Sequence, residues 1–328
     1  MSVPSRYKIS TPLGSGTYGK VYLATLTTPL PLPTGEKLPT GTQVAIKTIN
    51  PVPLNPPPSN DSSSAAAASG VHISAIREVS IMRELSLIPD SPFLPLHDCY
   101  TTGPSLNLVL SLCPSDLSKV IAKRPLSVPE IRTLGSAMYG ALSTLHSLSV
   151  VHRDIKPDNI LISEGGRPLL SDFGLSRFAP PPGGQMSPEA VTLWYKPLEM
   201  LLGECYYTSS VDVWSLSCVL YECAVGDVLF RSGTGRDVDQ IKAVFEKLGS
   251  GMEGYKDAEL LPARVRGVKW TKGFKGTGVN VGKDKGLERV IRRGLEVDPG
   301  KRWTAAEALE DEWWREGERA EEGFLKDA

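Results

Sequence analysis

The chain has 328 residues and balances 36 basic against 37 acidic side chains, which gives a formal net charge of −1 at neutral pH. This length is large for a single hydrophobic core, so we expect two lobes that meet at a cleft. A net charge so close to zero provides no field to attract nucleic acid or an anionic membrane, and we expect neither as a partner.

A glycine-rich segment lies near the amino terminus, where residues 14–21 read GSGTYGKV. Its flanks, 7–13 and 21–26, have the composition of β-strands, and glycines without side chains let backbone N–H groups approach phosphate oxygens. Taken alone, such a turn also suits an ordinary hairpin or a dinucleotide-binding loop. The dinucleotide loop joins a strand to a helix, whereas two strands flank this turn, so the context favours a phosphate-binding hairpin.

A buried strand and an amphipathic helix follow. Residues 44–47 read VAIK and end the strand at Lys47, which either lies on the surface or pairs with nucleotide phosphates. From 72 to 88 the periodicity is helical, and Glu78 shares one face with apolar residues four and seven positions later. Glu78 can therefore point inward, and we expect it to form an ion pair with Lys47.

The most informative segment, HRDIKPDN, ends at Asn159, and a DFG triplet follows at Asp172. Asp154 can accept the proton of an attacking hydroxyl, and Lys156 can screen the phosphoryl group that moves. Asn159 and Asp172 can hold magnesium on a nucleotide. Either triplet alone could arise by chance, but the two aspartates stand 18 positions apart (172 minus 154) in one segment. Together these residues predict phosphoryl transfer from ATP.

With these motifs in this order, the chain resembles a eukaryotic protein kinase along nearly its whole length. Within that superfamily it is most similar to the cyclin-dependent kinases of the CMGC group, through four segments: SAIRE at 74–78, DFGLSR at 172–177, VTLWY at 191–195 and VDVWSL at 211–216. The resemblance implies an α+β fold with two lobes. The small lobe would hold an antiparallel sheet and one key helix, and the large lobe would be mostly helical.

The resemblance also implies a domain organisation: a small lobe at 1–112, a large lobe at 113–315 and a charged tail at 316–328. Two small-lobe connections are longer than the family norm. Residues 27–41, with four prolines, extend a hairpin, and residues 51–70 form a loop of low complexity rich in Pro, Ser and Ala. We expect the second connection to be disordered.

The implied activity is transfer of the γ-phosphate of ATP, with Mg²⁺, to serine or threonine in protein substrates, with a preference for sites before proline. The resemblance gives a catalytic set of Lys47, Glu78, Asp154, Lys156 and Asn159, and metal ligands Asn159 and Asp172. Three alternatives stay open. They are a cyclin-independent kinase of the same group, a mitogen-activated-type kinase, and a non-catalytic module on a kinase fold. The activation segment lacks the Thr-x-Tyr pair of the second, and the intact catalytic set argues against the third.

The nucleotide site also follows from the resemblance. Backbone groups of Ser111 and Cys113 would bind the adenine. Ala45 and Leu161 would sandwich its ring, and Asp116 would approach the ribose. The complete implied ATP-binding set is Leu13, Gly14, Ser15, Gly16, Thr17, Tyr18, Gly19, Val21, Ala45, Lys47, Leu110, Ser111, Cys113, Asp116 and Leu161.

Regulation by a partner is implied by the segment 74–78, which in the family is the docking surface for a cyclin. We therefore expect a cyclin-type regulatory subunit that favours the inward position of Glu78. The motif begins with Ile73 in place of the proline of the family. This difference keeps a cyclin-independent kinase open as an alternative.

Regulation by phosphorylation is implied as well. Ser187 takes the place of the activating threonine of the family, so we expect an upstream activating kinase. Three arginines would clasp the phosphate, although each alone would suit a solvated surface: Arg77, Arg153 and Arg177. Thr17 and Tyr18 match inhibitory sites at which a phosphate would repel ATP. Both also suit a strand-turn for ordinary reasons.

Substrate selection is implied by the segment after Trp194. Lys196 stands where proline-directed relatives have arginine, and lysine keeps the charge but lacks the planar donor fork. Glu199, which ends a Pro-Leu-Glu run in place of Ala-Pro-Glu, is expected to pair with Arg302. Lys156 and Thr192 imply serine or threonine acceptors over tyrosine.

Cysteine usage and the amino terminus indicate a compartment. The five cysteines, at 99, 113, 205, 218 and 223, form no paired metal-ligand spacing, and their odd number fits a reducing compartment. We expect buried thiols. The first six residues lack the apolar core of a signal peptide, and no run approaches the about 20 apolar residues of a membrane span. We expect a soluble intracellular protein of the nucleus or cytoplasm.

Overall fold

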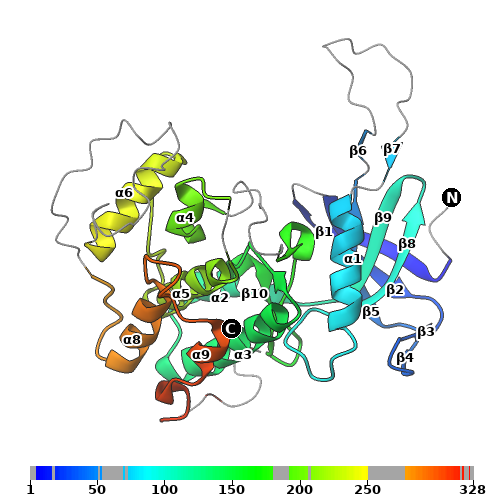
Figure 1. Cartoon of the computed structure of the whole chain (residues 1–328). Helices are drawn as coiled ribbons and strands as arrows, with labels where there is room; N and C mark the ends of the chain where they lie inside the picture. Colours follow the sequence, from blue (N-terminus) through cyan, green and yellow to red (C-terminus); the bar gives the residue numbers. More distant parts are fainter. Residues whose placement is uncertain are drawn as a thin grey trace. The chain divides into compact units, whose positions relative to one another are not determined.

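The computed structural model describes residues 5–16, 19–50, 52–53, 69–70, 73–179, 192–205, 208–249, 278–317, 320 and 325. The chain divides into two compact units. The first comprises Met1–Pro114 with Ser171–Gly174, and the second comprises Ser115–Leu170 with Leu175–Ala328. The first unit thus continues two residues past the expected boundary at 112 and includes the aspartate of the DFG triplet. The expected α+β fold is confirmed, because an antiparallel sheet dominates the first unit and helices dominate the second (Figure 1).

The sheet of the first unit has five antiparallel strands in the order β1-β2-β5-β9-β8. Their bounds are β1 Tyr7–Gly16, β2 Gly19–Leu26, β5 Gln43–Ile49, β8 Leu96–Thr102 and β9 Ser105–Ser111. Strand β5 continues two residues past Lys47, where the sequence placed its end. In the ladder, Lys47 lies opposite Val21 of β2 and Leu108 of β9. The lysine therefore sits in the central strand, next to the glycine-rich hairpin.

Helix α1 spans Ile73–Leu85, three residues shorter at its carboxyl end than the periodicity predicts. The residues after it form hydrogen-bonded turns, in which the amide of Leu87 donates to the carbonyl of Glu84 at 3.2 Å. The buried face of the helix consists of Ala75, Glu78, Ile81, Met82 and Leu85. Glu78 is thus held inward by the apolar residues that share its face, as the spacing predicts.

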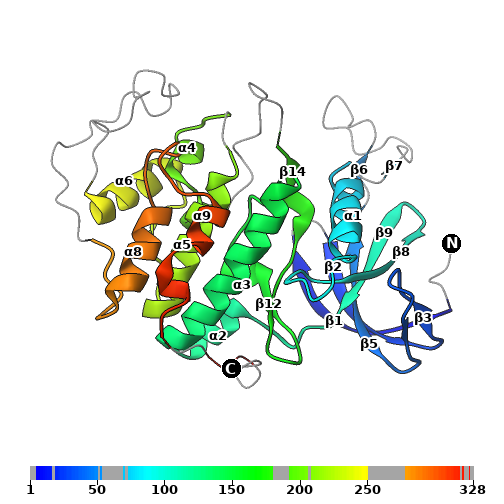
Figure 2. The same cartoon turned by 60° about the horizontal axis from the view of Figure 1, so that its bottom comes forward.

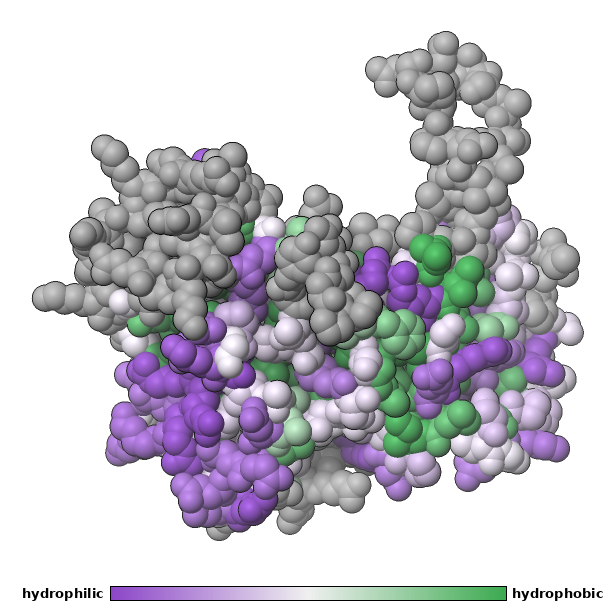
Figure 3. Space-filling model, viewed as in Figure 1, coloured by the Kyte–Doolittle hydropathy of each residue, from purple (hydrophilic) through white to green (hydrophobic). Residues whose placement is uncertain are grey.

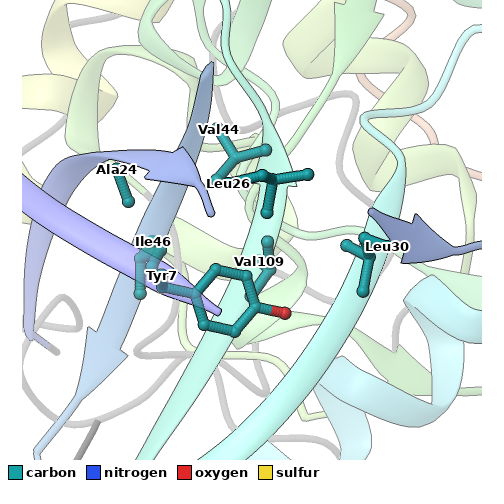
Figure 4. Close-up of a cluster of buried hydrophobic side chains, with 7 residues drawn as sticks. All are labelled: Tyr7, Ala24, Leu26, Leu30, Val44, Ile46 and Val109. Atoms are coloured by element: carbon teal, nitrogen blue, oxygen red, sulfur yellow. The ribbon is translucent and has the colours of Figure 1, made fainter. Parts of the chain in front are cut away.

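The long connection at 27–41 forms a small hairpin of its own, with β3 at Leu30–Pro31 and β4 at Lys37–Leu38. Leu30 is 1% exposed and joins a buried apolar cluster on the sheet, and Leu38 packs against it. The other members are Tyr7, Ala24, Leu26, Val44, Ile46 and Val109 (Figure 4). The connection therefore covers one face of the sheet.

The second unit contains seven described helices and two small sheets. The helices are α2 Leu117–Lys123, α3 Val128–Ser147, α4 Leu198–Leu201, α5 Ser210–Val225, α6 Asp237–Leu248, α8 Lys285–Gly294 and α9 Ala305–Leu309. One sheet consists of β10 Ser115–Asp116, β12 Ile160–Ile162 and β13 Pro168–Leu170, and the other of β11 Val150–Val151 and β14 Arg177–Phe178. Short 3₁₀ turns occur at η1 Pro157–Asn159, η2 Phe173–Leu175, η3 Leu193–Tyr195 and η6 Glu312–Trp314.

Helix α5 is the centre of the second unit, buried on nearly every side. Helices α3 and α8 pack against it, and α9 packs against α3 (Figure 2). The contact with α8 requires a glycine, because a Cβ atom at Gly294 would lie 1.9 Å from Oγ of Ser217. Helix α3 begins with a capping box in which Ser127 and Glu130 satisfy each other's backbone amides. These helix contacts hold in place the part of the second unit to which residues 152–159 belong.

Two predicted irregular segments show local structure. At the ends of the low-complexity connection, β6 Val52–Pro53 pairs with β7 Ser69–Gly70, and the residues between them lie outside the described part. The tail was predicted as a separate charged segment, but Leu325 is 1% exposed and the amide of Ala320 donates to Oγ1 of Thr133 at 3.1 Å. At these residues the tail belongs to the second unit.

The described residues include no helix long and apolar enough to cross a bilayer. The five cysteines all lie among the described residues, and none of them forms a disulfide bond. Cys218 and Cys223 are buried, whereas the other three are partly exposed, so the expectation of buried thiols is correct for two of them.

Candidate active site

A three-residue ionic bridge lies in the first unit. The Nζ atom of Lys47 lies 2.8 Å from Oε1 of Glu78 and 2.7 Å from Oδ1 of Asp172. Glu78 is only 3% exposed. The ion pair predicted between β5 and α1 is therefore present, and it extends to the carboxylate of the DFG triplet.

The electrostatics of this bridge keep Lys47 charged. Burial alone would lower the pKa of Lys47, but the carboxylates of Glu78 and Asp172 act in the opposite direction and raise it above its ordinary value. A permanent ammonium group suits the binding of phosphate oxygens.

Asp172 adopts an unusual backbone conformation, with φ of 61°. This left-handed region is uncommon outside glycine, although aspartate tolerates it better than most residues. The next residue, Phe173, is buried and packs edge to face against Phe93, with ring centroids 6.1 Å apart. Strained backbone held by surrounding packing is typical of functional sites. The buried ring fixes the turn that presents the Asp172 carboxylate to Lys47.

A second polar network lies in the second unit, around Asp154, which is 5% exposed. Lys156 donates from Nζ to Oδ2 of Asp154 at 2.7 Å, and Thr192 donates from Oγ1 to Oδ1 at 3.0 Å. The amide Nδ2 of Asn159 donates to the backbone carbonyl of Asp154 at 2.8 Å and to Oδ2 at 2.9 Å. Both carboxylate oxygens are thus oriented, which suits a group that must accept a proton from one direction.

Asp212 of α5 anchors this loop, a role that the sequence analysis missed. Its fully buried carboxylate accepts hydrogen bonds from the backbone amides of His152 at 2.8 Å and Arg153 at 2.7 Å, and from Nε2 of His146 at 2.9 Å. Burial would raise the pKa of Asp212, but these donors outweigh it and lower the pKa. The available signal was a carboxylate in the first turn of a helix whose next nine residues are uncharged, because a charge in such a buried helix needs buried partners.

The two expected metal ligands lie in different units, Asp172 in the first and Asn159 in the second. The amide nitrogen of Asn159 donates to Asp154, so its carbonyl oxygen is the atom suited to a cation. Carboxylate and amide oxygens are the ligands that Mg²⁺ prefers, so each of the two groups has the chemistry expected of a magnesium ligand. Within the described ranges no group of three or more His, Cys, Asp or Glu side chains forms a metal site.

The nucleotide residues of the first unit line the β1–β2 hairpin and the neighbouring strands. Gly19 is required by packing, because a Cβ atom there would lie 1.8 Å from the carbonyl oxygen of Thr48. Ala45 and Leu110 are direct partners across the β5–β9 ladder, and both are buried. Thr17 and Tyr18 lie outside the described residues.

The nucleotide residues of the second unit, Asp116 and Leu161, are partners in the β10–β12 ladder. The Asp116 carboxylate also caps α2, because Oδ1 accepts the amide of Lys119 at 3.0 Å and Oγ of Ser118 at 2.6 Å. Burial acts to raise the pKa of Asp116, but the Lys119 ammonium, 2.8 Å from Oδ2, together with these two hydrogen bonds lowers it. The group expected at the ribose therefore also has a structural role.

Comparison with known proteins decides the family. The family model described as protein kinase domain matches residues 7–314. Two curated relatives are a cell division protein kinase of Encephalitozoon cuniculi and the cell division control protein 2 homolog 3 of Trypanosoma brucei brucei. The first is 35% identical over 198 residues, which cover 60% of this chain and 62% of the relative. The second is 31% identical over 316 residues, which cover 94% of this chain and 92% of the relative.

The chain belongs to the protein kinase family. A solved structure of the CAK complex of Chaetomium thermophilum bound to ATP-γ-S matches with a TM-score of 0.76 and 27% identity, covering 97% of this chain and 94% of that one. Together with the cell division kinases, it confirms the resemblance to the cyclin-dependent kinases. The chain is therefore an ATP-binding phosphotransferase of that type.

Two of the kinase's three predicted phosphate-clasping arginines lie in the second unit, one in the β11–β14 ribbon and one two residues after β11. Arg177 pairs with Val151 in the β11–β14 ladder, and Arg153 donates from Nε to the carbonyl of Leu175 at 2.8 Å. Arg77 lies on α1 in the first unit, and its buried Nη1 atom has no hydrogen-bond partner among the residues that the structure describes. Ser187 lies outside the described residues.

The segment after Trp194 is tied to the second unit of the kinase by two ion pairs. Glu199 and Arg302 form the predicted pair, with both side chains fully buried and two bonds of 2.8 and 3.1 Å. Lys196, which is 7% exposed, lies 3.5 Å from the carboxylate of Asp237 on α6. The sequence analysis did not predict this second partner.

Proposed function

We propose that the kinase phosphorylates serine and threonine in proteins. The observation that carries this proposal is the triangle of Asp154, Lys156 and Thr192. Nζ of Lys156 and Oγ1 of Thr192 lie 2.7 and 3.0 Å from the carboxylate oxygens of Asp154, and these two atoms lie 3.0 Å from each other. The lysine and the threonine together hold the base at the place where a short aliphatic hydroxyl would approach.

The chemistry assigns a role to each group. Asp154 accepts the proton of the attacking hydroxyl, and Lys156 stabilises negative charge on the phosphoryl group as it moves. Lys47, held by Glu78, binds the α- and β-phosphates of ATP. Mg²⁺, bound by Asn159 and Asp172, would neutralise charge on the phosphate oxygens. These residues mainly orient the reactants and neutralise charge on the phosphate oxygens. The rate of phosphoryl transfer therefore depends on the geometry of these contacts.

We propose in addition that proline is favoured after the phosphorylated residue. Lys196 keeps the positive charge that proline-directed relatives have at this position, and its pairing with Asp237 holds the segment against α6. Lysine cannot make the bidentate contacts of arginine, so we expect a weaker preference for proline than in those relatives.

The experiment is phosphorylation of four peptides by the purified chain, upstream-phosphorylated and with a cyclin panel present. The peptides differ only at the acceptor and the next residue: Ser-Pro, Thr-Pro, Ser-Ala and Tyr-Pro. We expect phosphoserine and phosphothreonine, more of the first two products than of Ser-Ala, and none from tyrosine. Asp172→Ala is the control that should abolish all of them. Phosphotyrosine, or activity unaffected by that change, would contradict the proposal.

We propose that a cyclin-type subunit binds α1. Four apolar side chains of α1 and the following turn are exposed: Ile73 by 67%, Ile76 by 55%, Leu87 by 58% and Ile88 by 36%. Figure 3 shows hydrophobic surface over this helix. Exposed apolar side chains gathered along one helix and its following turn favour a protein interface, and the buried face of the same helix carries Glu78. A partner seated here would stabilise the inward position of that glutamate.

The change Ile76→Glu is expected to weaken cyclin binding at least about tenfold, because it places a charge at the centre of an apolar interface. Binding and activation are measured against a panel of purified cyclins. The matched control is Val225→Glu, which alters a side chain of the second unit that is 39% exposed. Equal binding by both variants, or no binding by any cyclin, would refute the docking surface.

We also propose activation by a phosphate on Ser187, added by an upstream kinase. Arg177 lies in the β11–β14 ribbon and Arg153 bonds to Leu175 just before it, and Arg77 has a buried nitrogen without a partner among the described residues. A phosphoserine supplies the two negative charges and three acceptor oxygens that such cations pair with.

Replacement Ser187→Ala is expected to lower the activity of the upstream-phosphorylated enzyme at least about tenfold, which corresponds to one charge-assisted hydrogen bond. Activity is compared with that of Ser147→Ala, a change at an exposed serine on α3. Mass spectrometry locates the phosphate. If the phosphorylated enzyme and Ser187→Ala are equally active, activation does not depend on this residue.

A further inference from the structure

His97 in β8 occupies a β-bulge next to the predicted adenine site. The residues before and after it pair with two consecutive residues of β9, so His97 is the extra residue of the ladder. Bulges redirect side chains and are common beside active sites. Here Nε2 of His97 lies 2.9 Å from Oγ of Ser111.

Ser111 is the last residue of β9, where the chain leaves the sheet toward Cys113. It is held at two atoms by the same short segment. Its hydroxyl bonds to His97, and its backbone amide donates to the carbonyl of Pro95 at 3.3 Å. Val44 of β5 lies opposite it in the ladder. The contacts with His97, at the bulge, and with Pro95, two residues before it, thereby hold the backbone of Ser111 in place.

The His97 ring keeps one charge state, and so can keep its hydrogen bond to Ser111, across the physiological pH range. Burial lowers the pKa of His97 to about 4, so the ring is neutral at physiological pH. A neutral imidazole carries one N–H and one lone pair. It can bond to a hydroxyl in either direction without placing a charge beside the nucleotide.

We propose that His97 is a positioning residue for nucleotide selection. Its bond to Ser111 fixes the backbone that distinguishes the 6-amino group of adenine from the 6-oxo group of guanine. The inference rests on the proposed ATP-dependent function and on the backbone role expected for Ser111. A backbone carbonyl oxygen that is held in place accepts a hydrogen bond from the 6-amino group of adenine and repels the 6-oxo group of guanine. A mobile carbonyl oxygen discriminates less between the two bases.

The test compares kcat and KM for ATP and GTP in the full chain and its variants. In His97→Leu we expect the ratio of kcat/KM for ATP to that for GTP to fall about three- to tenfold, the range of one hydrogen bond. The change should appear in KM for ATP, with kcat nearly unchanged. His97→Gln, which can place an amide nitrogen near Oγ, should restore the ratio. In the Ser111→Ala background His97→Leu should have no further effect.

The matched control is Thr102→Val, which removes another side-chain bond between β8 and β9, from Nδ2 of Asn107 to Oγ1 of Thr102 at 3.0 Å. It should leave the ratio unchanged, and melting temperatures verify that all variants fold. An equal loss for both nucleotides, or a loss that persists without the Ser111 hydroxyl, would overturn the inference. If the wild-type chain, upstream-phosphorylated and bound to an activating cyclin, shows no nucleotide-dependent phosphorylation, the proposed function is overturned and the inference with it.

Discussion

Asp154→Asn is expected to lower kcat by about 10²- to 10⁴-fold, the range for loss of a general base. Asparagine has nearly the same shape and its oxygen can still accept from Lys156, but it cannot take the proton of the attacking hydroxyl. KM for ATP should change little, because the nucleotide contacts assigned to Lys47 and the glycine-rich hairpin are untouched. The measurement is steady-state phosphorylation of a Ser-Pro peptide, with ATP affinity followed separately.

The control for this prediction is Asp158→Asn in the same loop. Asp158 is exposed, whereas Asp154 is 5% exposed and is held by three side chains. Asp158→Asn removes one negative charge from the loop, as Asp154→Asn does, yet it should leave kcat within a few-fold of the wild type. Comparable losses in the two variants would mean that loop charge, and not proton transfer, limits the reaction.

The ionic bridge of the first unit could be predicted from the sequence because each member lies in a strong local pattern. Lys47 follows a buried strand, and Glu78 shares a helix face with apolar residues. Asp172 belongs to a recognisable triplet. The periodicity of a strand or helix determines the face on which each side chain lies, and the folded protein keeps both patterns. The strand end at Lys47 and the helix end at Ile88 were wrong by two and three residues, as end positions depend on contacts that periodicity does not contain.

Other features could not be predicted because they depend on residues far apart in the chain. Asp212 acquires its partners 59 and 60 positions away, and nothing in the local sequence identifies them. The bulge at His97 depends on the register between β8 and β9, which the mixed polar and apolar sequence of β8, without regular alternation, does not specify. Lys196 was considered only for its position beside the substrate, whereas its pairing with Asp237 requires α6 to pack nearby.

The pair of Glu199 and Arg302 supports a second prediction with a large effect, this time on stability. Both side chains have no exposed surface, and two hydrogen bonds join them. Arg302 also donates to the carbonyls of Ser210 at 3.0 Å and Glu296 at 2.9 Å, and it lies 4.9 Å from the ring centre of Trp214. The guanidinium therefore links helix α4, helix α5 and the segment before α9.

Arg302→Met is expected to lower the free energy of unfolding by about 3–5 kcal/mol, because it leaves the Glu199 carboxylate buried without a partner. The double variant Glu199→Gln, Arg302→Met should recover part of that loss, since it removes the charge as well. Arg315→Met, which breaks an exposed pair with Glu310, should cost less than about 1 kcal/mol. Denaturant unfolding measures all three. If Arg302→Met and Arg315→Met cost the same, the buried pair is not what holds the segment after Trp194 in place, and the position of Lys196 would need another explanation.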